Sequence, residues 1–249
     1  FSLLPDGARI QVERYRSGDV PRGFRAKLRR TFLERRAMMM VVRTVVIDDA
    51  VRAAPAAQVV ILGAGLDGRA WRMPELAHSI VFEVDHPDSQ REKRGRLVSL
   101  TQAAREVRFV PVDFTRDRLD EALAAHGHDP ALPTTWIWEG VAMYLDQAAI
   151  EATLAVLRQR SPAGSRLIVT YFRPALIAKL VGILVARLGE PLRSAFQPEA
   201  WRELLAQHGF RVREDADLCE LSARFEREVQ EATRPMRHFR IAIAERTAE

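Results

Sequence analysis

The sequence is poor in the residues that build disulfide or metal frameworks, with one cysteine and six histidines in 249 residues. The single cysteine, Cys219, excludes an internal disulfide and a cysteine-rich zinc site. The histidines form no HExxH or HxxxH pair, and His126 and His128 lie in a segment typical of turns. We therefore expect no structural metal.

Long hydrophobic runs are also missing. The longest apolar stretch, Leu176 to Leu188, is interrupted by Lys179 and is too short to span a bilayer. No signal-peptide pattern opens the sequence. We therefore expect a soluble, cytoplasmic protein without a membrane partner.

Acidic residues are scarce at the start of the chain. Residues 1–43 hold eleven Lys and Arg against four Asp and Glu, whereas residues 44–249 hold twenty-seven against twenty-nine. A nucleic-acid-binding arm is one interpretation of this surplus. A helix with a solvated basic face is favoured over it, because no aromatic residues are interleaved on a strand and apolar residues recur at helical spacing. These apolar residues are Leu28, Phe32, Met39, Val42 and Val46.

Short apolar runs alternate with amphipathic stretches along the rest of the chain. The predicted strands are Val59–Leu62, Ile80–Val84, Val107–Val112, Thr135–Trp138, Leu167–Tyr171, Phe210–Arg213 and Phe239–Ala244. The helical patterns between them include Pro87–Ala104, Arg116–Ala125, Gln147–Arg160 and Pro198–His208. Such alternation predicts an α/β fold, in which helices cover both faces of a mostly parallel, seven-stranded sheet.

We expect one domain over residues 1–249, which is long enough to bury a sizeable core. A helical arm is predicted over 1–55, a cofactor-binding core over 56–173, a helical cap or lid over 174–197, and the final helices and strands over 198–249.

A glycine turn is the most informative segment. The strand ending at Leu62 runs into Gly63, Ala64 and Gly65, and a helical stretch follows Gly68. Glycine permits a sharp turn and a close approach to a ligand, and a helix start offers free N–H groups. Asp85, twenty residues beyond Gly65, ends the next strand, where a carboxylate can accept the hydroxyls of an adenosine ribose. This context favours a nucleoside-containing cofactor over a purely structural turn.

The charge of Asp67, inside the turn, bears on which cofactor binds. It would repel the pyrophosphate of a dinucleotide, whereas the sulfonium and ammonium groups of S-adenosyl-L-methionine favour nearby carboxylates. No tyrosine has a lysine four residues on, as some dehydrogenases require. S-adenosyl-L-methionine is therefore favoured, and an NAD(P)-dependent oxidoreductase using the same turn remains the alternative.

Two further strand ends support a ligand site. Asp113 and Phe114 follow the third strand, where they could bind the amino group and ring edge of an adenine. Glu139 follows the fourth strand and would face the same crevice, at the carboxyl ends of the strands. Taken singly, each acid could instead cap a helix.

These segments resemble the leucine carboxyl methyltransferase family. The resemblance rests on Gly63–Arg72, Phe82–Pro87, Val112–Phe114 and Glu139–Tyr144, in that order. It implies a class I, Rossmann-like methyltransferase fold and an O-methyltransferase that uses S-adenosyl-L-methionine and releases S-adenosyl-L-homocysteine.

The resemblance also implies roles for single residues. Gly63, with Ala64 and Gly65, would line the methionine part of the cofactor, and Asp85 would hold the ribose. Asp113 and Phe114 would frame the adenine, and Glu139 would lie near the amino group. Arg43 would lie near the methionine carboxylate, although Arg35 and Arg36 are close enough in sequence to compete for this alignment. Tyr144 would face the methyl group as a candidate catalytic residue.

The acceptor is expected to be a small molecule, which could be anionic and largely apolar. A carboxylate acceptor needs no general base, whereas a hydroxyl acceptor does. His86 and Tyr171 are conceivable bases, although a structural role is the commoner one for each. Family members acting on small molecules and polyketides suggest natural-product tailoring.

Overall fold

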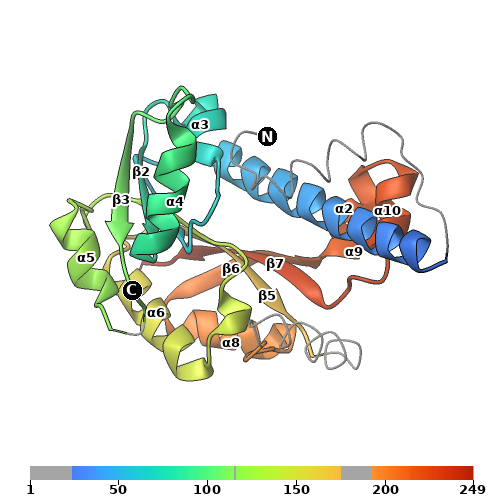
Figure 1. The fold of residues 1–249 in the computed structure, drawn as a ribbon. Coiled ribbons are helices and arrows are strands. Elements are labelled where there is room, and N and C mark those ends of the chain that lie inside the picture. Colours follow the sequence, from blue (N-terminus) through green and yellow to red (C-terminus); the bar gives the residue numbers. More distant parts are fainter. Residues whose placement is uncertain (1–23, 115, 175–191, 249) are drawn as a thin grey trace.

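A computed structural model describes residues 24–114, 116–174 and 192–248. Seven strands in these residues form one sheet with the order β3-β2-β1-β4-β5-β7-β6 (Figure 1). The strands are β1 (Gln58–Leu62), β2 (Ile80–Asp85), β3 (Glu106–Pro111), β4 (Thr134–Trp138), β5 (Arg166–Phe172), β6 (Phe210–Asp217) and β7 (Phe239–Arg246). Each overlaps one of the seven apolar runs, so the predicted strands are confirmed.

The sheet is mostly parallel, as the sequence predicted. β1 to β5 all run in one direction. β7 lies between β5 and β6 and pairs antiparallel with both. The last strand of the chain is therefore inserted between two earlier strands and runs antiparallel to both.

The helices agree with the sequence less closely than the strands do. They are α2 (Phe24–Ala53), α3 (Arg69–Arg72), α4 (Pro87–Leu97), α5 (Leu119–Ala125), α6 (Gln147–Gln159), α8 (Pro198–Gln207), α9 (Leu218–Leu221) and α10 (Arg227–Thr233). The prediction that a helix continues to Ala104 is wrong, because the N–H groups of Ala103 and Ala104 donate to Ala70 O instead. The short helices α9 and α10 were not predicted, since neither is long enough for a clear helical period.

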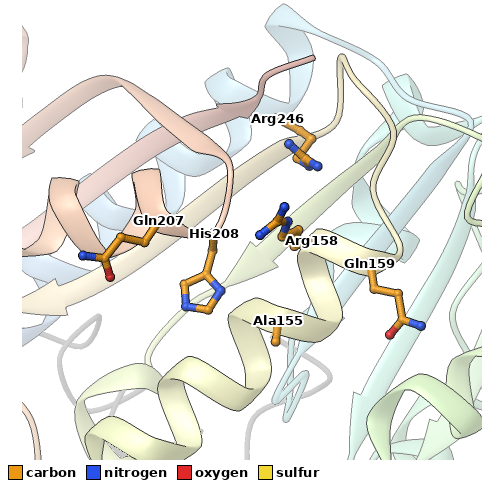
Figure 2. A pocket seen from close by; sticks show the side chains of 6 residues that line it. All are labelled: Ala155, Arg158, Gln159, Gln207, His208 and Arg246. Carbon is orange, nitrogen blue, oxygen red and sulfur yellow. The ribbon is translucent and has the colours of Figure 1, made fainter. Parts of the chain in front are cut away.

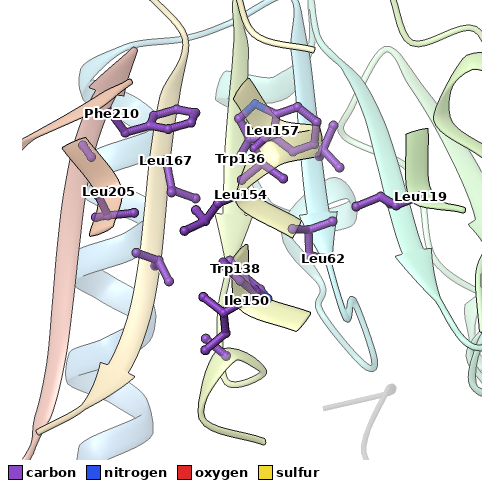
Figure 3. Packing of buried hydrophobic residues seen from close by; sticks show 14 of the residues in the cluster. Leu62, Leu119, Trp136, Trp138, Ile150, Leu154, Leu157, Leu167, Leu205 and Phe210 are labelled. Atoms are coloured by element: carbon purple, nitrogen blue, oxygen red, sulfur yellow. The ribbon is translucent and has the colours of Figure 1, made fainter. Parts of the chain in front are cut away.

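One face of the sheet packs against α5, α6 and α8. Alternate strand residues such as Val60 and Leu62 join the leucines of these helices in one buried cluster (Figure 3). Trp136 and Trp138 are buried there, and Trp136 Nε1 donates to Ser161 Oγ at 2.8 Å. These two tryptophans therefore belong to the core.

The other face packs against α2, α3 and α9, where the intervening residues Val59 and Ile61 meet Val42 and Ile47 of α2. α10 lies along α2 on this side (Figure 1). A helix over Phe24–Ala53 thus lies within the segment predicted as a helical arm. Residues 1–23 of the arm, and 175–191 of the predicted cap, lie outside the described residues.

Candidate functional site

The strand ends singled out by the sequence lie side by side. β3, β2, β1 and β4 are consecutive parallel strands, so their carboxyl ends meet at one edge of the sheet. This edge carries the glycine turn after β1, Asp85 at the end of β2, Asp113 after β3 and Glu139 after β4. The chain reverses its strand order at β1, which is where open α/β sheets bind ligands.

The glycine turn is tightly packed on one side and open on the other. Gly63 and Gly65 have φ angles of +65° and +44°, in the left-handed region that favours glycine. A Cβ on Gly63 would lie 2.3 Å from Val141 Cγ2, so no larger residue fits there. A Cβ on Gly65 would meet only Gly63 O at 3.9 Å and Asp85 Oδ2 at 4.0 Å. A ligand can therefore approach the backbone at Gly65 closely.

The turn is attached to β2 by two contacts. Ala64 is buried, and its N–H donates to Val84 O at 3.0 Å. Asp85 Oδ2 accepts a hydrogen bond from the N–H of Gly65, and Oδ1 accepts one from His86 N–H at 2.6 Å. The Asp85 carboxylate is thus held beside the turn by backbone groups, with lone pairs left for further donors.

Asp113 and Phe114 lie at the next loop along the edge. Asp113 Oδ2 accepts from Arg116 Nη2 at 2.6 Å and lies 3.9 Å from His86 Nε2, so this loop meets the loop after β2. The Phe114 side chain is 41% exposed. The exposed Phe114 ring thus offers a flat apolar surface at the carboxyl ends of the strands, against which a planar ligand group could lie.

Arg43 of α2 forms an ion pair with Glu139, which directly follows β4. Arg43 Nε lies 2.5 Å from Glu139 Oε1, as an ion pair without the alignment of a hydrogen bond. Arg35 and Arg36 of the same helix are exposed. Of these three arginines, Arg43 is therefore the one that contacts an acid at the end of a strand.

Sequence reasoning missed a buried arginine at the centre of this edge. Arg69, the first residue of α3, donates from Nη1 to Glu139 Oε2 at 2.6 Å and from Nε to Asp48 Oδ1 at 2.8 Å. Nη1 also donates to Asp67 Oδ2. No local pattern reveals this role, because Asp48 comes from α2 and Glu139 from the end of β4.

Arg69 changes the effect expected of the Asp67 charge on a bound cofactor, because the two side chains form an ion pair. Burial would lower the pKa of Arg69, but attraction by Asp67, Glu139 and Asp48 outweighs it and raises the pKa. The side chains of Asp67 and Arg69 are 8% and 3% exposed. The charge of Asp67 is therefore balanced inside the protein, and its expected repulsion of a pyrophosphate is weaker than the sequence suggested.

Tyr144 lies in a single turn of 3-10 helix, η2 (Ala142–Tyr144), shortly after Glu139. Its side chain is partly buried against the cluster that includes Met143. The N–H groups of Arg193 and Ser194 donate to Met143 O at 2.9 and 3.2 Å. The chain that leaves the predicted cap is thereby fastened to this turn.

Two conceivable bases have structural partners. Tyr171 is buried, and its hydroxyl donates to Asp215. Burial, with the charge of Asp215 and the hydrogen bond to it, raises the pKa of Tyr171. His86 accepts from Asp88 N–H at 3.3 Å and caps α4. Neither arrangement favours proton abstraction from a substrate.

A pocket of about 570 Å³ lies between α6, α8 and the end of β7. Figure 2 shows the side chains that line it. It is lined by Ala155, Arg158, Gln159, Gln207, His208 and Arg246. Arg246 pairs with Phe210, the first residue of β6, and Glu245 pairs with Arg166, the first residue of β5. The pocket therefore lies at the opposite edge of the sheet from the glycine turn.

Within the described residues, no group of three or more His, Cys, Asp or Glu side chains is placed to hold a metal ion. None of the helices in this part of the chain combines the length and apolarity that a bilayer crossing requires.

Comparison with known proteins identifies relatives by sequence. Residues 3–158 match the family model for leucine carboxyl methyltransferase. A Streptomyces coelicolor protein is 36% identical over 177 residues, which are 70% of this chain and 62% of the relative. It is named "Putative S-adenosyl-L-methionine-dependent methyltransferase". The first three curated relatives are matched over only 46–62% of their own length.

Solved structures match the fold. A DUF574-family protein from Streptomyces avermitilis has a TM-score of 0.59 at 17% identity, covering 85% of this chain and 82% of that one. Human N-acetylserotonin methyltransferase in complex with SAM has a TM-score of 0.53 at 14% identity, covering 88% and 56%. With the sheet order above, these similarities confirm the predicted class I methyltransferase fold.

Proposed function

This chain belongs to the leucine carboxyl methyltransferase family, and on that premise we propose that it is an S-adenosyl-L-methionine-dependent O-methyltransferase acting on a small molecule. The curated S-adenosyl-L-methionine-dependent relative supports the cofactor. The chain spans about half to three-fifths of the length of these relatives. The activity of the whole protein is therefore part of the proposal.

One observation carries the proposal at the level of the site. The methionine part of the cofactor is a zwitterion, with one carboxylate and one ammonium group. Arg43 and Glu139 present the complementary charges beside the glycine turn, with Nε and Oε1 2.5 Å apart. A dinucleotide has no such paired charges on its phosphates, so this arrangement favours S-adenosyl-L-methionine over NAD(P).

The remaining edge fits the adenosine part. Asp85, already held by Gly65 N–H, would accept the ribose hydroxyls with its remaining lone pairs. Asp113 would accept from the adenine amino group, and Phe114 would lie against the ring. The open space over Gly65 would admit the ligand close to the backbone.

When bound, S-adenosyl-L-methionine would supply a sulfonium methyl group for transfer to the acceptor oxygen, with S-adenosyl-L-homocysteine as the leaving group. This protein's residues would align the two reactants and exclude water, a contribution of about 7–11 kcal/mol in well-oriented reactions. Tyr144 would contact the acceptor beside the methyl group.

A carboxylate is the acceptor group that this site fits best, and a hydroxyl is second. The two side chains considered as bases, Tyr171 and His86, have structural partners. A carboxylate is already deprotonated at neutral pH, so its methylation needs no base.

Equilibrium dialysis against S-adenosyl-L-homocysteine and NADH tests the cofactor. We expect binding of the first and none of the second. Binding of NADH alone would replace the proposal by the oxidoreductase alternative. Methyl transfer is then measured with methyl-labelled S-adenosyl-L-methionine and a panel of carboxylic acids and phenols. Labelling of phenols without acids would contradict the carboxylate assignment.

A further inference from the structure

Arg69 links the candidate site to the protein interior. Side-chain exposure rises from 3% at Arg69 to 11% at Glu139 and 17% at Arg43. The three charges therefore form a row that leads outward from the core. Glu139 uses one oxygen in each direction, with Oε2 toward Arg69 and Oε1 toward Arg43.

The two arginines differ in how firmly they are held. Arg69 contacts three carboxylates, those of Asp48, Asp67 and Glu139. Removing a buried charge from such partners is costly, so Arg69 has no alternative position. Arg43 contacts Glu139 without the alignment of a hydrogen bond and lies nearer to solvent. Its contact with Glu139 is the one that a ligand can replace.

We propose that Arg69 is a positioning residue for the amino-acid end of the cofactor, a role that rests on the function proposed above. It holds Glu139 through Oε2, so that Oε1 faces the site and binds the ammonium group. The methionine carboxylate takes the place of Glu139 beside Arg43. Arg43 and Glu139 thus pair with each other in the structure, and each would pair with one charge of the methionine zwitterion when the cofactor binds.

The planar guanidinium of Arg69 is needed for this role. It donates in different directions from Nε and Nη1, toward α2 on one side and toward the turn and Glu139 on the other. A lysine ammonium is a point charge and cannot keep all three carboxylates in these positions. Arg69→Lys should therefore displace Glu139 while preserving the net charge.

Two ligands separate this role from a purely structural one. S-adenosyl-L-homocysteine carries the amino-acid end, and 5′-methylthioadenosine lacks it but keeps the adenosine. Calorimetry on the folded chain measures both affinities for wild type, Arg69→Lys and the matched control Arg72→Lys. Arg72 lies on the same short helix and also binds Asp48, but it reaches Asp48 from the more exposed end of the helix and does not hold Glu139.

Wild type should bind S-adenosyl-L-homocysteine more tightly than 5′-methylthioadenosine. Arg69→Lys should lower the affinity for S-adenosyl-L-homocysteine about ten- to a hundredfold, as for loss of one charge-assisted hydrogen bond. Its affinity for 5′-methylthioadenosine should stay the same, and Arg72→Lys should change neither. Melting curves compare the folded state of the three proteins.

Other outcomes overturn the inference. Equal weakening of both ligands would mean that Arg69 only supports the glycine turn, and unchanged affinities would mean that it has no role in binding. If wild type binds neither ligand, the proposed cofactor fails and this inference fails with it.

A double-mutant cycle gives an independent check. If Arg69 acts through Glu139, adding Arg69→Lys to Glu139→Gln should cost little further affinity for S-adenosyl-L-homocysteine. Additive losses would contradict this path of action.

Discussion

Lys93 Nζ lies 2.5 Å from Glu83 Oε2, and both side chains are 1% exposed. Glu83 lies on β2 two residues before Asp85, and Lys93 reaches it from α4 while lying 5.0 Å from the centre of the Trp71 ring. Burial raises the pKa of Glu83 to about 7, although Lys93 opposes this shift. A buried ion pair with a titratable member thus supports the strand that carries Asp85.

Lys93→Met should destabilise the protein in a pH-dependent way. The folded-state pKa of Glu83 lies above its unfolded value near 4.3, so stability falls as pH rises from about 4.5 to 7. Loss of Lys93 raises this pKa further, because the Glu83 carboxylate then has no buried partner. The free energy of unfolding of Lys93→Met should therefore lie about 3–5 kcal/mol below that of wild type at pH 8. Urea unfolding at pH 5.5 and pH 8 measures it, and a deficit independent of pH would refute the prediction. Adding Glu83→Gln should remove the pH dependence.

Asp85→Ala should weaken the binding of S-adenosyl-L-homocysteine. The carboxylate both accepts from Gly65 N–H and is proposed to accept from the ribose, and each charge-assisted hydrogen bond contributes about 1.5–3 kcal/mol. We expect a loss of roughly ten- to a hundredfold by calorimetry. Asp85→Asn keeps an acceptor for the backbone and should lose less. Unchanged affinity in Asp85→Ala would show that Asp85 is not at the ribose.

Arg43→Ala should raise the KM for S-adenosyl-L-methionine, because Arg43 is proposed to bind the methionine carboxylate. Arg43→Lys keeps the charge without the planar fork and should recover part of the loss. Arg36→Ala, an exposed arginine of the same helix, is the matched control and should change nothing. If Arg43→Ala instead lowers only the kcat/KM for the acceptor, Arg43 lies on the substrate side.

The two tyrosines should respond differently to loss of their hydroxyl groups. Tyr171→Phe should cost about 1.5–3 kcal/mol of stability, because its hydroxyl donates to the Asp215 carboxylate, and should leave methyl transfer and its pH profile unchanged. Tyr144→Phe should lower the kcat/KM for the acceptor about tenfold, as for one lost hydrogen bond. Steady-state kinetics and melting curves separate the two effects. A large loss of activity in Tyr171→Phe would restore it as a candidate base.

Gly63→Ala should destabilise the glycine turn. The new Cβ would lie 2.3 Å from Val141 Cγ2, and alanine at a φ of +65° costs about 1–2 kcal/mol before any steric clash. Gly95→Ala, in α4, meets open space and should stabilise the protein by about 0.5–1 kcal/mol. Thermal unfolding of the two variants gives the comparison. Equal melting temperatures would contradict the tight packing at Gly63.

The fold was largely predictable because its signals are local. Buried strands read as short apolar runs such as Ile80–Val84, and a turn that needs positive φ reads as glycine. Helix ends were less predictable. The segment after Leu97 continues a helical pattern, yet its backbone bonds to Ala70 and Leu76 instead.

The sequence by itself also determined which acids follow which strands, and therefore that Asp85, Asp113 and Glu139 share one edge of a parallel sheet. Only the tertiary structure decided their partners. It selected Arg43 over Arg35 and Arg36, and it placed Arg69 among Asp48, Asp67 and Glu139. Ion pairs of this kind join residues from different elements, so they depend on how helices pack on the sheet and which charges that packing buries. No periodicity or spacing within one segment carries that information.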